Sequence, residues 1–257
     1  MTHAITLVLV AACGRLGFDR EGASSSTESG GAPNTIDAGA GTVDAPDDGM
    51  PTLVASSTNS MDGVSSLVIT VPALATGDLV IAGVNMHERS GAVSAATDDA
   101  PIANTYVSAR VPCRVGDTST GQSNEIWYAV VTSPGATRIE FEFNDKVGGS
   151  IWILELAGMA ITSPLDAAAT TVLPPDAIAN APSVSISNAH ELVFSIINLT
   201  TGNVSGIHAG NPFTALPRLE GDGAAFAFTS RIGSYGAAWD ETSTSIACAS
   251  TAAFRAL

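Results

Sequence analysis

The chain has 257 residues, of which 45% are hydrophobic and 14% are charged, and its formal net charge is −15. An acidic surface repels the phosphates of nucleic acids and of anionic lipids, so this charge excludes a nucleic-acid-binding protein. The length is sufficient for one large domain with a substantial core, preceded by an N-terminal segment.

Residues 1–12 are typical of a bacterial lipoprotein signal peptide. Residues 4–12 are apolar apart from Thr6, a length that suits a signal h-region and is too short to span a bilayer as a helix. The segment ends in Val10-Ala11-Ala12-Cys13, a lipobox, so we expect cleavage before Cys13 and lipid attachment to its sulfur. Gly14 follows, rather than the aspartate of inner-membrane retention, which favours an outer-membrane lipoprotein. The alternative is a chance Ala-Ala-Cys in an alanine-rich chain.

Residues 13–52 have the composition of a flexible linker. Between residues 22 and 49 the chain is mainly Ser, Thr, Gly, Ala, Asp and Pro, and acidic residues outnumber basic ones. With so little apolar surface to bury, this segment is predicted to be disordered. A flexible chain of this length reaches roughly 35 Å, which would lift a folded domain above the lipid headgroups.

Residues 53–257 are predicted to form one all-β domain. Runs of β-branched and aromatic residues are separated by turn residues, and no long helical period occurs. These short strands imply two packed antiparallel sheets, a β-sandwich, because one open sheet would leave an apolar face in water. The strands are expected near Val64–Val71, Leu79–Val84, Tyr106–Val111, Glu125–Thr132, Thr137–Phe143, Ser150–Leu156, Ser183–Ser187, Glu191–Asn198, Ala225–Ser230, Gly236–Trp239 and Ser245–Arg255.

Scattered strings in this domain are similar to a jelly-roll-like sandwich domain that is common in secreted and surface bacterial proteins. They include Thr76–Ala82, Ile126–Ala129, Ile153–Gly158 and Glu191–Phe194. Likewise, Cys13–Asp19 resembles the start of a class of bacterial lipoproteins. The resemblance implies a jelly-roll-like fold and an extracytoplasmic location, and it carries no catalytic residues.

Lipidation of Cys13 would leave two further cysteines, Cys113 and Cys248. An even pair in an oxidising compartment favours a disulfide bond. Such a bridge would close a loop of roughly 135 residues and stabilise the fold by about 4–5 kcal/mol in the chain-entropy model. Two separately buried thiols are the alternative.

Catalytic patterns are weak in this chain. Glu140, Glu142 and Asp145 resemble the carboxylates of jelly-roll glycosidases, but their order differs from Glu-x-Asp-x-x-Glu, so a solvated face is the better interpretation. Ser205 does not stand in the Gly-x-Ser-x-Gly of a nucleophile elbow. Three histidines lack the spacing of a zinc helix and are expected to be surface or packed residues: His87, His190 and His208. We therefore expect a protein that is not an enzyme.

Two acidic pairs could supply the oxygen ligands of a structural calcium ion. Asp98 and Asp99 stand in an expected loop, and Asp240 and Glu241 follow an expected strand end. No EF-hand or repeat spacing accompanies them, so solvated loop carboxylates are the alternative.

Aromatic residues suggest a second kind of site, since sugar rings stack on exposed aromatic side chains. Trp152 lies in an apolar run and is expected in the core, as is one of the adjacent Trp127 and Tyr128, which face opposite ways in a strand. This leaves Tyr235 and Trp239, in a glycine-rich segment, as the expected sugar platform.

Together these features predict a lipid-anchored protein of the cell envelope or cell surface, whose non-catalytic sandwich contacts an envelope polysaccharide or another protein. A carbohydrate-binding module on a lipoprotein is the alternative, and a glycoside-active enzyme is a third.

Substitution of Cys13 tests the predicted anchor. Cells grown with a fatty-acid analogue should label the wild-type chain and leave Cys13→Ser unlabelled, because acylation requires this cysteine. Equal labelling of both forms, or labelling of neither, contradicts the prediction.

Overall fold

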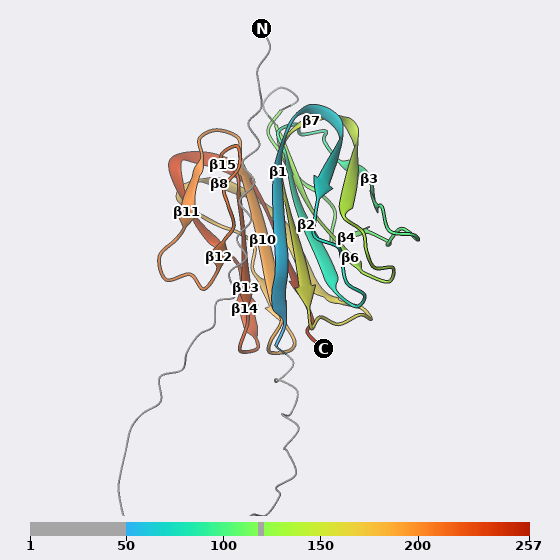
Figure 1. Ribbon diagram of the computed structural model, residues 1–257. Coiled ribbons are helices and arrows are strands. Elements are labelled where there is room, and N and C mark those ends of the chain that lie inside the picture. Colours follow the sequence, from blue (N-terminus) through green and yellow to red (C-terminus); the bar gives the residue numbers. More distant parts are fainter. Residues whose placement is uncertain (1–49, 118–120) are drawn as a thin grey trace, which may run out of the picture. The chain divides into compact units, whose positions relative to one another are not determined.

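The computed structural model describes residues 50–117 and 121–257, which form an antiparallel β-sandwich (Figure 1). The predicted all-β, two-sheet architecture is confirmed. No helix in the described ranges is long and apolar enough to cross a membrane. The predicted signal peptide, Cys13 and almost all of the predicted linker lie outside the described residues.

The first sheet has seven strands and the second has six, and a separate two-stranded sheet accompanies them. The first sheet contains β1 (Thr52–Thr70), β2 (Leu79–Met86), β3 (Val93–Asp98), β4 (Val107–Ser108), β5 (Cys113–Val115), β6 (Gln122–Val130) and β7 (Arg138–Ala157). The second contains β8 (Leu165–Asn180), β10 (Leu192–Leu199), β11 (Val204–Ile207), β12 (Thr214–Ala215), β13 (Gly223–Phe228) and β15 (Ala238–Phe254). The small sheet pairs β9 (Val184–Ile186) with β14 (Gly233–Tyr235).

Each large sheet comes from one half of the domain, and the two halves repeat one arrangement. In the first half, long β1 pairs with long β7, which pairs with β2, which pairs with β6. In the second half, β8, β15, β10 and β13 follow the same order. The short central strands also match in sequence, since Asp78–Asn85 reads DLVIAGVN and Glu191–Asn198 reads ELVFSIIN.

The main core lies between the sheets. It contains Ile81 and Trp152 from the first sheet, and Phe194 and Phe254 from the second, each almost fully buried. The Trp152 indole donates a hydrogen bond to the Pro217 carbonyl, 2.7 Å away, so this large ring is buried with its polar atom satisfied. The expected core position of Trp152 is thereby confirmed.

The first sheet bends back over its own outer face. One part of β7, from residue 149 to 156, pairs with β2, whereas residues 138–143 pair with β3 and with the end of β1. Gly149 has a φ of 135°, and a Cβ there would lie 2.0 Å from the Asn85 carbonyl oxygen, so only glycine fits this bend. We call the three-stranded part made by 64–70, 93–98 and 138–143 the outer layer. It covers a second core that includes Phe141.

β2 and β10 face one another across the sandwich at close range. A Cβ on Gly83 would lie 2.6 Å from Ile196 Cγ2, so glycine allows this approach. Two buried asparagines then bond across the sheets in opposite senses: Asn85 Nδ2 donates to the Ile197 carbonyl at 2.8 Å, and Asn198 Nδ2 donates to the Met86 carbonyl at 3.2 Å. These bonds fix the position of one sheet relative to the other, because any slip would leave buried polar groups unpaired.

A disulfide bond also connects the sheets, from Cys113 in β5 to Cys248 in β15, with a Cα separation of 5.7 Å. The closed loop spans 135 residues. Both cysteines are buried beside Val115. The structure thus corresponds to the bridged arrangement rather than to two separate thiols.

Several strands differ in length from those predicted. The two segments expected at 137–143 and 150–156 are one strand, β7, and those at 236–239 and 245–255 are one strand, β15, which carries a register shift between Asp240 and Ser245. The whole of β8 was not expected. It contains Pro174 and Pro175, which a ladder tolerates at an edge, and β8 indeed pairs only with β15.

Gly83→Ala should destabilise the domain by about 1–3 kcal/mol, because the added methyl group overpacks the contact between the sheets. Gly206→Ala is a matched control, since a Cβ at Gly206 in β11 meets nothing within 4 Å. Urea unfolding of the two variants measures the difference. An equal effect of both substitutions would show that the close approach is not a packing constraint.

Candidate functional site

One of the two residues of the expected sugar platform, Trp239, does not lie on the surface. Trp239 is only 1% exposed, and its ring packs so closely that a Cβ on Gly223 would lie 2.7 Å from it. Tyr235 is half-buried in β14, and its hydroxyl donates to the Arg231 carbonyl at 2.8 Å. The expectation for Trp239 is wrong, because this side chain packs in a buried apolar cluster that includes Ile197 and Val204. The glycine-rich segment around Tyr235 and Trp239 suggested exposed rings. In the structure, a glycine of β13, Gly223, instead lets the Trp239 ring pack closely.

Asp98 and Asp99 lie at the end of β3 and organise the loops around them. Asp98 accepts hydrogen bonds from the backbone of Ala100, from Asn104 and from the Tyr106 hydroxyl. Asp99 accepts from the backbone of Thr137 and Arg138, at 2.7 and 3.0 Å, and these bonds lower its pKa. Donors of the protein itself therefore surround both carboxylates.

The second acidic pair is split between different neighbours. Asp240 meets His208, with 2.7 Å between Oδ1 and Nδ1. Glu241 accepts from the Ser245 backbone, and burial raises its pKa. Across residues 50–117 and 121–257, no three acidic, histidine or cysteine side chains gather as a metal site would require. The calcium sites remain predictions from the sequence.

Two of the three histidines face aspartates that are distant in sequence. His208 pairs with Asp240, and His87 at the end of β2 lies 3.2 Å from the Asp222 carboxylate beside β13. His190 instead stands in a turn, with a φ of 64°. The sequence offered no signal for either pair, since neither has a local spacing that a motif could reveal.

The His87–Asp222 pair joins the two sheets at one end of the sandwich. The Asp222 side chain is 3% exposed, and burial acts to raise its pKa. The hydrogen bond with Asp222 raises the pKa of His87, although burial acts in the opposite direction. Protonated His87 therefore supplies the counter-charge that a buried carboxylate needs.

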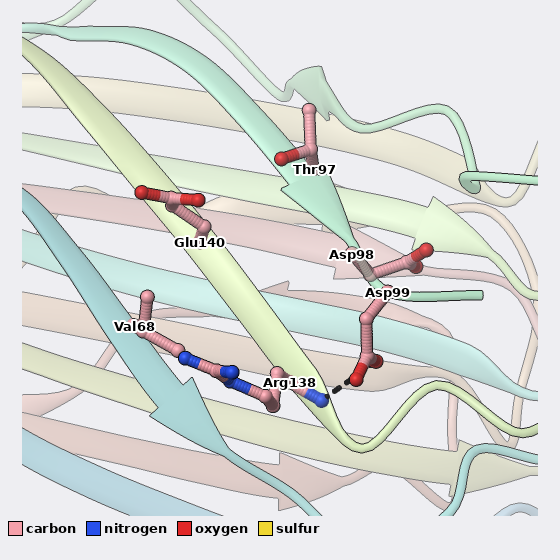
Figure 2. A pocket seen from close by; sticks show the side chains of 6 residues that line it. All are labelled: Val68, Thr97, Asp98, Asp99, Arg138 and Glu140. Carbon is pink, nitrogen blue, oxygen red and sulfur yellow. Dashed lines mark hydrogen bonds between the residues drawn. The ribbon is translucent and has the colours of Figure 1, made fainter.

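The outer layer carries a polar depression on its exposed face, which we call the β7 hollow (Figure 2). Its volume is about 210 Å³, and it is lined by Val68, Thr97, Asp98, Asp99, Arg138 and Glu140. Alternation along β7 creates it: Ile139, Phe141 and Phe143 are buried beneath the layer, so the side chains between them point outward. The sequence alternates apolar and acidic residues from Ile139 to Phe143, and the burial of these side chains follows that alternation.

Arg138 and Glu140 flank the β7 hollow without pairing. They occupy the same face of one strand, yet none of the ion pairs among the described residues includes either of them. Figure 2 shows the Arg138 guanidinium beside Val68 and apart from the Glu140 carboxylate. Glu142 is exposed further along β7, and Asp145 is exposed at its bend. The three acidic residues considered for glycoside chemistry therefore do not line one pocket.

No family model, curated protein or solved structure matches this chain. The chemistry of the site therefore follows from the geometry of the described residues alone. The β7 hollow brings a cation, three carboxylates, a hydroxyl and an apolar side chain together around one space.

Substitution of His87 should have a pH-dependent cost. Because the folded-state pKa is raised from 6.5, its stabilisation is present below about pH 6.5 and is lost as the pH rises through the folded value. His87→Gln should therefore lower the free energy of unfolding by about 1–3 kcal/mol near pH 6 and by less near pH 9. In an Asp222→Asn background the pH dependence should disappear. Denaturant unfolding at both pH values decides this, and an equal cost at the two would contradict the ion pair.

Proposed function

We propose that this chain is a lipid-anchored protein of the bacterial cell envelope, whose β-sandwich contacts an envelope polymer or another protein without catalysing a reaction. The observation that carries the proposal is the order of its parts. A lipobox ends at Cys13, an acidic spacer follows, and β1 of a compact domain begins at Thr52. This order suits a rigid module that is presented at a distance from the lipid surface.

Two buried acidic groups of the sandwich, Glu125 and Glu191, are hydrogen-bonded within the fold. Glu125 accepts hydrogen bonds from the Trp127 indole at 2.7 Å and from the Val93 backbone at 3.0 Å. Glu191 likewise accepts from the backbone and side chain of Asn188. Burial raises the pKa of both carboxyl groups. Their hydrogen bonds connect strands and turns, so these groups serve the fold.

The disulfide bond and the net charge agree with an envelope location. Disulfides persist in oxidising compartments, and Cys113–Cys248 joins the two sheets. The domain from residue 53 onward has 8 basic and 18 acidic residues, a balance that keeps it away from anionic lipid and from nucleic acid. The predicted lipid would then be its link to the membrane.

Fractionation and protease treatment of intact cells test this proposal. The wild-type chain should sediment with membranes, and external protease should release the domain by cutting in the spacer, because a cross-linked sandwich resists cleavage. Cys13→Ser should move to the soluble fraction with its fold unchanged. Cleavage only after the outer membrane is permeabilised would indicate a periplasm-facing domain. Recovery of both forms in the cytosol would contradict the proposal.

A further inference from the structure

The β7 hollow holds two opposite charges that the protein does not use for itself. Asp98 and Asp99 are held by donors of the protein, so the side chains left with free polar atoms are Thr97, Arg138 and Glu140. Arg138 is exposed and Glu140 is half-buried. Alternate residues on one face of a strand have Cα atoms about 7 Å apart, a separation that long side chains could close. Here they leave a gap instead.

The charges of the hollow restrict the ligand that fits it. A simple anion on Arg138 would face the carboxylates of Asp98, Asp99 and Glu140, and a simple cation on Glu140 would face the guanidinium of Arg138. A polyanion would also meet a domain with ten more acidic than basic residues, which repels it. A neutral sugar would pair with neither charge. A group with one charge of each sign can pair with both Arg138 and Glu140, and its positive charge also lies near the carboxylates of Asp98 and Asp99.

The geometry points to the β7 hollow as a binding site for an amino-acid-type zwitterion, free or on the peptide part of an envelope polymer. The ligand carboxylate bonds to the guanidinium of Arg138, which suits planar two-oxygen acceptors. The ligand ammonium bonds to the carboxylate of Glu140. The Thr97 hydroxyl and the Val68 side chain contact the carbon skeleton.

The size of the hollow agrees with this assignment. Its volume of about 210 Å³ is below the roughly 300–1,000 Å³ that enclose larger ligands, so it suits one amino acid unit. The shallow, solvent-exposed setting weakens charged contacts, so the expected Kd for a single unit is on the order of 10 mM. A polymer that repeats the unit would bind anchored copies more tightly through avidity. A ligand carried by an envelope polymer requires the proposed envelope function, so this part of the inference rests on that proposal.

Titration of the full chain with alanine, followed by NMR of backbone amides, tests the site. Alanine should shift the amides of Thr97, Arg138 and Glu140. N-acetylalanine lacks the ammonium and alaninamide lacks the carboxylate, so each should bind about two- to fivefold more weakly, because each loses one solvent-exposed ion pair. Equal binding of all three compounds, or no shifts with alanine, overturns the inference.

Matched variants separate the site from a general surface effect. Arg138→Gln and Glu140→Gln should each weaken alanine binding about two- to fivefold, whereas Glu142→Gln, on the same face of β7, should leave it unchanged. Retention of binding in both hollow variants overturns the site. These surface substitutions leave the backbone bonds of Arg138 to Asp99 in place.

Co-sedimentation with purified cell-wall peptide polymer distinguishes the two sources of the ligand. Loss of sedimentation in Arg138→Gln supports the polymer-borne zwitterion. If alanine binds but wild type does not sediment, the free amino acid is the ligand. If wild type and Arg138→Gln sediment equally, the proposed envelope function stands and the hollow is not its site.

Discussion

The contact between β2 and β10 is the constraint on which the rest of the sandwich depends. Gly83 lets the sheets approach, and Asn85 and Asn198 each bond to a carbonyl of the opposite strand. A purely apolar contact would allow several offsets of similar energy, whereas buried amides strongly favour one. Because the two halves repeat one strand order, this contact lies at corresponding positions of both.

The bends of the long strands follow from that central contact. With one face of β2 packed against β10, its other face would be open to solvent unless another layer covered it. β7 supplies that layer by bending at Gly149 and carrying Ile139, Phe141 and Phe143 over the second core. The same bend turns Arg138 and Glu140 outward, so the β7 hollow is a direct consequence of how the fold buries its second apolar face.

The fold class could be predicted from the sequence because strand patterns are local. The alternation at Ile139–Phe143 identified both the strand and its buried face. The bends were not predictable, since a strand that continues through a glycine has the same local pattern as two strands with a turn. Trp239 and the His87–Asp222 pair were missed for a related reason: burial and pairing depend on residues far away in sequence. For Glu140 the sequence predicted only a solvated strand face. It gave no sign that Glu140 and Arg138 border one hollow.

The position of the disulfide bond has a mechanical consequence. The covalent loop runs from Cys113 to Cys248 and so leaves β1 and β2 outside it. Among the described strands, β1 lies at the edge of its sheet and pairs with β7 alone, and it directly follows Pro51. A pulling force that enters at Pro51 therefore loads the β1–β7 ladder before it reaches the bridge. The strength of that ladder sets the force at which the domain begins to unfold.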